Sequence, residues 1–258
     1  MTTEKKDFLF RFVNPDIRKK IKLDEEALYS TTDQVTADKI TRDILNYISR
    51  SSTITDATAC IGGSAYSFAQ QFSNVIAIEN NKERFELLKH NMNILTSQSP
   101  LLNTNYNSHN QYIQHNSHNP HNQYIQHNSH IHCNIYNKLQ QYAYMQTKTN
   151  NVECRYGDAL LECQKQYQDA IFIDPPWGGP EYKTLDKVQL YLSGLPLYEV
   201  CKQIYNFTDY IIIKVPVNFD EVQFVNDTQT FMELQRKNSQ LRKMKLLIFQ
   251  TVKKTGLS

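Results

Sequence analysis

The chain has 258 residues, of which 40% are hydrophobic and 21% are charged, and its formal net charge is only +2. A net charge this small does not indicate broad affinity for nucleic acid, although a local basic site is compatible with it. The five cysteines are odd in number and scattered, which argues against a disulfide framework and for a reduced compartment. We therefore expect a soluble intracellular protein of the cytoplasm or nucleus, without a membrane-spanning segment.

The first part of the chain, residues 1–34, is interpreted as a basic N-terminal extension. Its clustered basic residues are Lys5, Lys6, Arg11, Arg18, Lys19, Lys20 and Lys22. Such a cluster can contact the phosphates of RNA, although a solvated surface explains it equally well. Over residues 35–48 apolar side chains recur at helical spacing, which predicts a helix with Thr36 as its N-cap.

A strand, a glycine turn and a helix follow, in the order that opens a nucleotide-binding βαβ unit. The strand covers residues 53–58, and the turn contains Gly62 and Gly63. The spacing is neither that of a dinucleotide fingerprint nor that of a P-loop, so a pyrophosphate ligand is disfavoured. The next strand, 74–78, ends at Glu79, whose carboxylate can accept two hydrogen bonds from a ribose diol. This combination suits S-adenosylmethionine, which has both ribose hydroxyls and no phosphate.

Residues 96–150 have the composition of an insertion that does not fold. Between Glu86 and Glu153 no acidic residue occurs, and the decapeptide His-Asn-Gln-Tyr-Ile-Gln-His-Asn-Ser-His stands at 109–118 and again at 121–130. Polar repetitive sequence cannot bury enough apolar surface to offset its ordering entropy. We predict a disordered low-complexity segment rich in Asn, Gln and His.

This insertion divides one enzyme domain into residues 35–95 and 151–258. Most of the histidines lie in the insertion, but they lack helical spacing and Cys-x-x-Cys partners, so we predict no metal site. After the insertion, a strand over 151–156 leads to Asp158. Its carboxylate can accept a hydrogen bond from an adenine N6 amine, or it can cap the helix that follows.

The most informative stretch is Asp-Pro-Pro-Trp-Gly-Gly-Pro at 174–180, directly after the apolar strand 170–173. Asp174 therefore lies at the carboxyl end of a buried parallel strand, where open α/β sheets bind ligands. The prolines remove N–H donors, and the carbonyls of Asp174 and Pro175 remain free to accept from an exocyclic amine. Trp177 adds a ring on which a flat base can stack. The alternative is a Pro-Gly turn with a buried tryptophan.

The C-terminal part continues the alternation of helices and strands. We predict a helix over 196–205, a strand over 209–215, and a closing antiparallel pair formed by 231–236 and 244–252.

Four stretches of the chain resemble the trimethylguanosine synthases, which are RNA cap guanine-N2 methyltransferases. They are Asp-Ala-Thr-Ala-Cys-Ile-Gly-Gly at 56–63, Val-Ile-Ala-Ile-Glu at 75–79, Pro-Pro-Trp-Gly-Gly-Pro-Glu-Tyr at 175–182, and Val-Thr-Ala-Asp-Lys-Ile at 35–40. The resemblance covers most of residues 30–250 apart from the insertion. It implies an α/β fold, a Rossmann-like class I S-adenosylmethionine-dependent methyltransferase, with a mostly parallel seven-stranded sheet and a C-terminal antiparallel hairpin.

The resemblance also implies transfer of methyl from S-adenosylmethionine to N2 of a 7-methylguanosine cap, with capped RNA as partner of a monomer. We assign catalysis to Asp174, Pro175 and Trp177. Cofactor binding is assigned to Asp56, Ala57, Cys60, Gly62, Gly63, Glu79 and Asp158. Substrate binding is assigned to Trp177, Tyr182 and Lys214. Trp177 stacked on the cationic 7-methylguanine gains a cation–π energy of about 0.5 to 2 kcal/mol.

Two positions depart from the family pattern. Many members have Ser where this chain has Asp174, although both residues can accept a hydrogen bond. The family's L-P-R-N stretch corresponds to Val-Pro-Val-Asn at 215–218, which lacks the Arg expected near the cap phosphates. Lys214 is the candidate substitute, and a lysine that extends into solvent is the alternative.

Two other functions compete with this interpretation. Asp-Pro-Pro-Trp also marks enzymes that methylate adenine N6 in RNA or DNA, but in the best-known RNA group that motif precedes the cofactor glycines, whereas here it follows them. A non-catalytic cap-binding module is the third possibility. The presence of Asp56, Glu79 and Asp174 argues against it, because a binding module needs no cofactor pocket.

Overall fold

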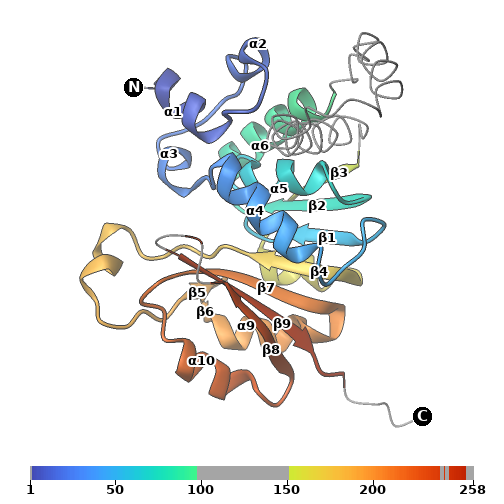
Figure 1. Ribbon diagram of the computed structural model, residues 1–258, viewed down its shortest axis with the longest axis vertical. Helices are drawn as coiled ribbons and strands as arrows, with labels where there is room; N and C mark the ends of the chain where they lie inside the picture. Colours follow the sequence, from blue (N-terminus) through green and yellow to red (C-terminus); the bar gives the residue numbers. More distant parts are fainter. Residues whose placement is uncertain (1, 98–150, 239–240, 242–243, 254–258) are drawn as a thin grey trace, which may run out of the picture. The chain divides into compact units, whose positions relative to one another are not determined.

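The computed structural model describes residues 2–97, 151–238, 241 and 244–253, which form a seven-stranded sheet with helices on both sides (Figure 1). The helices before the insertion are α1 (Thr2–Leu9), α2 (Pro15–Arg18), α3 (Ala27–Ser30), α4 (Gln34–Ile44), α5 (Gly63–Ala69) and α6 (Lys82–Thr96). The later ones are α8 (Ala159–Cys163), α9 (Leu197–Ile204) and α10 (Glu221–Thr228), with the 3-10 helices η2 (Pro180–Thr184) and η3 (Tyr205–Phe207). The strands are β1 (Thr53–Asp56), β2 (Asn74–Glu79), β3 (Val152–Tyr156), β4 (Gln168–Ile173), β7 (Thr208–Pro216), β8 (Met232–Asn238) and β9 (Met244–Thr251), with the short pair β5 (Tyr191–Leu192) and β6 (Leu195–Pro196).

The strand order of the large sheet is β3-β2-β1-β4-β7-β9-β8. The pairs from β3 to β7 are parallel, whereas β9 runs antiparallel to both β7 and β8. This arrangement confirms the predicted mostly parallel sheet with a closing antiparallel hairpin. The sheet grows outward from β1 through β2 and β3, then returns to add β4 on the other side of β1. The carboxyl ends of β1 and β4 therefore flank a topological switch point, where open sheets bind ligands.

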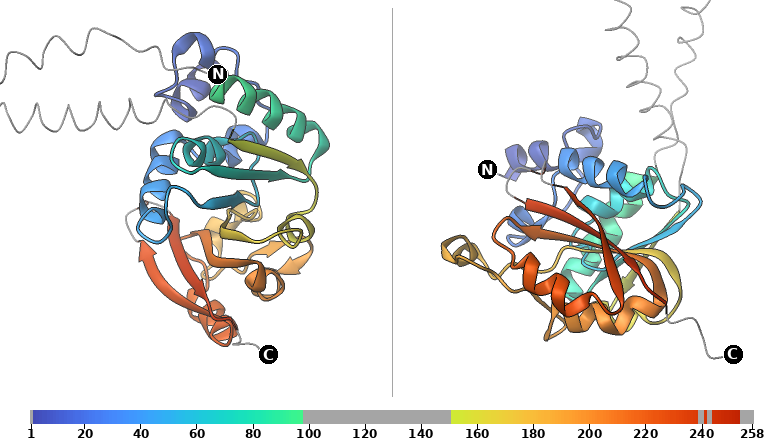
Figure 2. Two further views of the ribbon diagram at one scale, coloured as in Figure 1. Left: turned by 90° about the vertical axis from the view of Figure 1, so that its right-hand side faces the viewer. Right: turned by 60° about the horizontal axis from the view of Figure 1, so that its bottom comes forward.

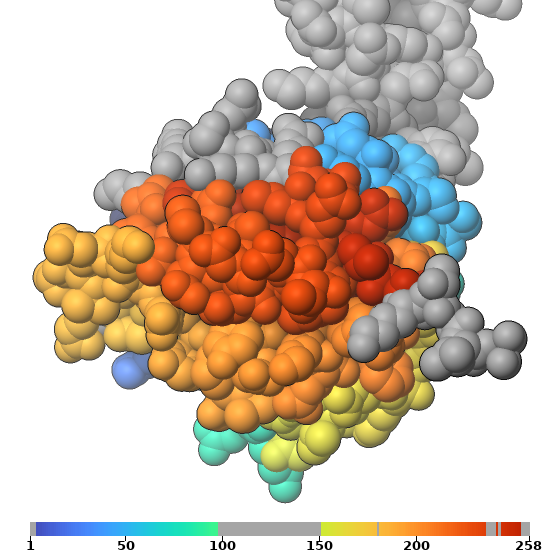
Figure 3. All heavy atoms as spheres, turned by 90° about the horizontal axis from the view of Figure 1, so that it is seen from below, coloured from blue at the N-terminus to red at the C-terminus, as the bar shows by residue number. Residues whose placement is uncertain are grey.

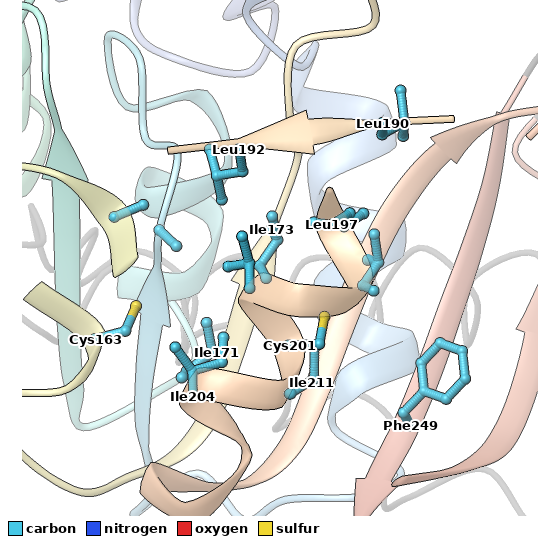
Figure 4. Packing of buried hydrophobic residues seen from close by; sticks show 14 of the residues in the cluster. Cys163, Ile171, Ile173, Leu190, Leu192, Leu197, Cys201, Ile204, Ile211 and Phe249 are labelled. Atoms are coloured by element: carbon cyan, nitrogen blue, oxygen red, sulfur yellow. The ribbon is translucent and has the colours of Figure 1, made fainter. Parts of the chain in front are cut away.

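The strands are apolar on both faces because helices cover both (Figure 2). Along β4, Ile171 and Ile173 pack in one cluster with α8, α9 and α10, while Ala170 and Phe172 pack in a second cluster with α4, α5 and α6. Figure 4 shows Ile171 close to Cys201 and Ile204 of α9 in the first cluster. Figure 3 shows the outer surface of that layer, built from α9 and α10. This packing fixes the positions at which the strands end.

Helix α4 begins earlier than its predicted N-cap. Asp33 is the N-cap, and its Oδ1 accepts the Thr36 backbone N–H at 3.3 Å. The Thr36 hydroxyl donates in turn to Asp33 Oδ2 at 2.7 Å. The prediction of Thr36 as N-cap was therefore wrong, because an aspartate three residues earlier takes the N–H that a cap must satisfy.

The N-terminal helices are attached to the sheet unit through an apolar cluster. Its buried members are Leu9, Phe10, Val13, Ile21, Ala27, Ile61 and Leu95. Asn91 of α6 reinforces the attachment, since its side chain exchanges two 2.8 Å hydrogen bonds with the backbone of Lys22. The predicted insertion began at residue 96, but Thr96 is a buried residue of α6; residues 98–150, with the histidines of the insertion, lie outside the described residues.

Candidate active site

Asp174 follows β4 directly and lies beside the end of β1. Its backbone N–H donates to the Thr58 hydroxyl at 2.8 Å. The adjacent Ala57 N–H donates to the carbonyl of Phe172 at 2.9 Å, which continues the β1–β4 pairing past Asp56. The backbone thus places the predicted amine-binding residue at the switch point of the sheet.

The Asp174 carboxylate forms a buried ion pair with Lys214 of β7. Lys214 Nζ lies 2.5 Å from Asp174 Oδ2, and the two side chains are 7% and 14% exposed. The Lys214 ammonium also donates to Thr32 Oγ1 at 2.8 Å, and that hydroxyl lies 3.4 Å from Asp174 Oδ2. The interpretation of Lys214 as a lysine extending into solvent was therefore wrong, because a buried ammonium requires a charged partner and finds one on the neighbouring strand.

Burial raises the pKa of Asp174 above its usual range, and Lys214 and Thr32 oppose this rise by favouring the charged form. Within the described residues, the hydrogen bonds to this carboxylate all reach Oδ2. Asp174 Oδ1 therefore accepts no hydrogen bond from a described side chain.

Trp177 and Tyr182 form an aromatic corner next to this ion pair. Their ring centroids lie 5.2 Å apart at an interplanar angle of 85°, an edge-to-face arrangement. Lys214 Nζ lies 5.5 Å from the centroid of Trp177. The indole Nε1 is buried and has no hydrogen-bond partner among the described residues, so it is a donor that remains to be satisfied.

A glycine turn and Asn218 hold the corner in place. Gly178 and Gly179 have φ values of +83° and +76°, a region that favours glycine, and they turn the chain into η2, which carries Tyr182. Asn218 follows β7, and its side chain donates at 2.7 Å to the carbonyls of Tyr182 and Leu185. The loop after β4 is thus tied to the end of β7.

The predicted cofactor residues lie around the ends of β1 and β2. Ala59 N donates to the carbonyl of Ile78 at 2.8 Å, so the glycine turn begins against β2. Gly62 has φ +100° and is the N-cap of α5. A Cβ on Gly63 would lie 2.5 Å from the Thr32 carbonyl oxygen, so the segment that carries Thr32 packs directly on this turn. Cys60 has φ +52°, and burial raises the pKa of its thiol, which does not favour a nucleophilic role.

Asp56 and Glu79 place two buried carboxylates at these strand ends. Asp56 is 1% exposed, and its Oδ2 has no hydrogen-bond partner among the described residues. Burial is the largest cause that raises the pKa of Asp56 to about 7, and the charges of Asp174 and Glu79 add to it. The hydrogen bond from the Thr58 backbone and the charge of Lys214 lower this pKa. Glu79 is 6% exposed and accepts the Asn81 N–H at 2.8 Å. Burial raises its pKa, whereas the bond from Asn81 and the charge of Arg84 lower it.

Asp158 lies close to the same edge. Gly157 N donates to the carbonyl of Glu79 at 3.1 Å, which places the start of α8 beside the end of β2. Asp158 Oδ1 accepts the backbone N–H groups of Leu160 and Leu161, at 3.0 and 3.3 Å. The capping interpretation is therefore confirmed, and adenine recognition stays a prediction for this residue.

These residues fit S-adenosylmethionine by the chemistry of their donors and acceptors. The unpartnered Asp56 Oδ2 is an acceptor suited to a cationic ammonium group, and Glu79 is an acceptor at the position expected for ribose hydroxyls. The described residues contain no group of three or more potential metal-binding side chains.

A family model described as RNA cap guanine-N2 methyltransferase matches residues 51–254. The chain belongs to this family. The match begins just before β1 and extends past β9, so it includes the whole large sheet. Membership confirms the predicted class I fold and S-adenosylmethionine as the cofactor of this methyltransferase.

One sequence relative and two solved structures are also similar to this chain, and the two structures agree with the assignment at the level of fold. An uncharacterized protein of Acanthamoeba polyphaga mimivirus is 24% identical over 240 residues, covering 82% of this chain and 73% of that protein. A crystal structure from Porphyromonas gingivalis has a TM-score of 0.56 at 14% identity, and the match covers 96% of this chain but only 48% of that one. The rRNA methyltransferase AviRa of Streptomyces viridochromogenes has a TM-score of 0.52 at 11% identity, with 88% of each chain covered. In the described part of the present chain, no helix is long and apolar enough to cross a membrane.

Sequence reasoning did not identify Thr32, Thr58 and Asn218, which position the assigned residues. None of them is charged, and each acts on a residue far away in the sequence. The ion pair between Asp174 and Lys214 had a usable signal, since a lysine inside an otherwise apolar strand must find a counter-ion.

Proposed function

We propose that this methyltransferase transfers a methyl group from S-adenosylmethionine to the exocyclic N2 of a 7-methylguanosine RNA cap. The observation that carries the proposal is the position of the Trp177 ring beside the buried Asp174–Lys214 pair at the carboxyl ends of β4 and β7. A flat ring and an oriented carboxylate at this edge provide the two contacts that a cationic purine with an exocyclic amine requires. The family description supports the same substrate.

Trp177 gives the site its preference for a 7-methylated base. A cation–π contact of about 0.5 to 2 kcal/mol corresponds to a preference of roughly 2- to 30-fold over uncharged guanine. Lys214 already lies 5.5 Å from the ring centroid. Because Asp174 balances the charge of this ammonium, the pair as a whole does not repel a cationic base.

The Asp174 carboxylate and the Pro175 carbonyl orient the amine. With Asp174 Oδ2 bound to Lys214 and Thr32, one N–H of the base bonds to Oδ1 and the other to the Pro175 carbonyl. This arrangement holds the nitrogen lone pair in one direction and lets the nitrogen become pyramidal. After transfer, the new N–CH₃ bond leaves one excess proton on N2, and a carboxylate oxygen of Asp174 takes it. The raised pKa of Asp174 makes its carboxylate a stronger base than an exposed one.

The residues at the ends of β1 and β2 hold the cofactor. S-adenosylmethionine supplies an activated methyl group on a sulfonium centre. Asp56 would accept from its ammonium group, Glu79 would accept from its ribose hydroxyls, and Asp158 would lie near the adenine. Ala57, Cys60, Gly62 and Gly63 supply the turn between these carboxylates.

Methyl transfer from labelled S-adenosylmethionine tests the proposal directly. The acceptors are 7-methylguanosine diphosphate, GDP and an adenine-containing oligonucleotide, with mass spectrometry of each product. Label on N2 of the 7-methylated acceptor supports the proposal and counts the methyl groups. Label on adenine would assign the same residues to an N6 methyltransferase, and cap binding without any transfer would indicate a binding module. Either of these results overturns the proposed reaction.

A further inference from the structure

Two exposed aromatic rings and two cations lie together on the N-terminal helices. We call Lys5, Phe8, Arg11 and Tyr29 the aromatic–cationic patch. Phe8 is 46% exposed and Tyr29 is 82% exposed, unusual values for large rings. Lys5 Nζ lies 5.5 Å from the centroid of Phe8 and 6.0 Å from that of Tyr29, and Arg11 Cζ lies 5.4 Å from Phe8. The patch is therefore one continuous surface built from α1, the turn that follows it and α3.

The two cations of the patch keep their positive charge available. Among the described residues, Lys5 and Arg11 have no carboxylate within ion-pair distance. Neighbouring cations differ, because Arg18 pairs with Asp7 at 2.7 Å and Lys19 pairs with Asp16 at 3.1 Å. Lys6, Lys20 and Lys22 likewise form no ion pair within the described residues, so the patch holds two of the five uncompensated cations of the extension and is the place where cations lie over exposed rings.

The patch borders the candidate active site along the chain. Tyr29 precedes Thr32 by three residues, so their Cα atoms lie at most about 11 Å apart. Thr32 contacts Lys214 and Asp174 directly, at 2.8 and 3.4 Å. A polymer whose end is bound at Asp174 can therefore reach the patch within a few nucleotides.

We propose that the aromatic–cationic patch binds the single-stranded nucleotides that lie beyond the first nucleotide after the cap. This inference rests on the proposed function and extends it from the cap to the RNA chain. Bases stack on exposed rings without regard to sequence, and phosphates are attracted by Lys5 and Arg11. By the usual strength of base–aromatic stacking, loss of one ring weakens RNA binding about 5- to 150-fold.

The test compares a cap dinucleotide, 7-methylguanosine triphosphate linked to guanosine, with a capped single-stranded RNA of ten nucleotides. The wild-type protein should show a lower KM for the capped RNA than for the dinucleotide. Phe8→Ala and Tyr29→Ala should raise the KM for the RNA and leave the KM for the dinucleotide unchanged. Tyr167→Ala is the matched control, because Tyr167 is 47% exposed and its ring centroid lies 4.4 Å from Lys253 Nζ. Tyr167 directly precedes β4, at the amino end of this strand, whereas Asp174 follows its carboxyl end. Tyr167→Ala should change neither KM.

A binding measurement separates this inference from the proposed function. Fluorescence anisotropy with an uncapped ten-nucleotide RNA needs no methyl transfer, and each of Lys5→Gln and Arg11→Gln should lower the salt slope by about 0.7. RNA binding that depends on the patch, in a protein that methylates no cap, supports the inference and rejects the proposed function. Cap methylation with equal KM for both acceptors, or equal binding of RNA and polyglutamate, overturns the inference. Binding of polyglutamate alone would assign the patch to an acidic protein partner.

Discussion

The buried carboxylate of Asp56 gives the sharpest prediction for the cofactor site. The pKa of Asp56 rises from 3.8 to about 7 on folding, with burial as the largest cause. Between these two values the folded protein holds a proton that the unfolded chain releases. Stability therefore falls as the pH rises through this window, and the full cost is reached above pH 7.

Asp56→Asn removes the ionisation and leaves the shape of the side chain. Between pH 5 and pH 8.5 the wild-type protein should lose about 2 to 3 kcal/mol of unfolding free energy relative to this variant, at about 1.4 kcal/mol for each pH unit. The urea m-value is taken as roughly 2 to 3 kcal/mol/M. The difference in urea midpoint between wild type and Asp56→Asn should then change by about 1 M from about pH 5 to about pH 8.5.

The pH comparison removes the constant cost of introducing an amide, because that cost is the same at both pH values. Asp186, an exposed aspartate, provides the matched control, because Asp186→Asn makes the same chemical change at a position where no side chain is buried. The same Asp56→Asn variant should bind S-adenosylmethionine more weakly by calorimetry. A difference between wild type and Asp56→Asn that is equal at both pH values would refute the account of Asp56 as a buried, unpartnered acid.

Further predictions concern the reacting side of the site. Trp177→Ala should raise the KM for the cap by roughly 2- to 30-fold while S-adenosylmethionine affinity, measured by calorimetry, stays unchanged; equal loss of both would make Trp177 structural. Asp174→Ala should lower kcat more than cap affinity in steady-state assays, and an unchanged kcat removes it from the mechanism. Lys214→Met removes a contact that favours the charged form of Asp174, so its pKa rises further and the acid limb of the kcat profile should move to higher pH. Adding Asp174→Ser to Lys214→Met removes the uncompensated charge, so thermal unfolding should show the double variant more stable than Lys214→Met alone.

The sheet could be predicted because its signals are local. Strands β4 and β7 contain the apolar runs 170–173 and 211–213, and each strand is followed by a turn with Gly, Pro or Asn. The pair β5 and β6 was not predicted, because two-residue strands give no periodicity. The start of α4 was misplaced for a related reason, since Asp33 and Thr36 are both acceptable caps and only the backbone geometry decides between them.

Part of the candidate site could be located from the strand pattern, whereas Trp177, Tyr182 and Lys214 were assigned from the resemblance to a family. Asp56, Glu79 and Asp174 each stand at a strand end, so the strand pattern alone located them. Thr32 has no such signal: it reaches Lys214 across 182 positions of the chain, and a threonine in a connection between helices is ordinary.

The ion pair between Asp174 and Lys214 explains how an acid can occupy this buried position at the end of β4. A lone carboxylate here would be desolvated and would lie near Asp56, whose own pKa is already raised by Asp174. Lys214 comes from the strand paired with β4, and its ammonium neutralises Asp174 before any substrate binds. Because Lys214 is buried and bound in this way, the proposed function gives it the role of positioning and charging the amine acceptor, without contact with a cap phosphate. On the same proposal, the positive charge for phosphates comes from exposed residues, and we expect Lys5 and Arg11 of the aromatic–cationic patch to supply part of it.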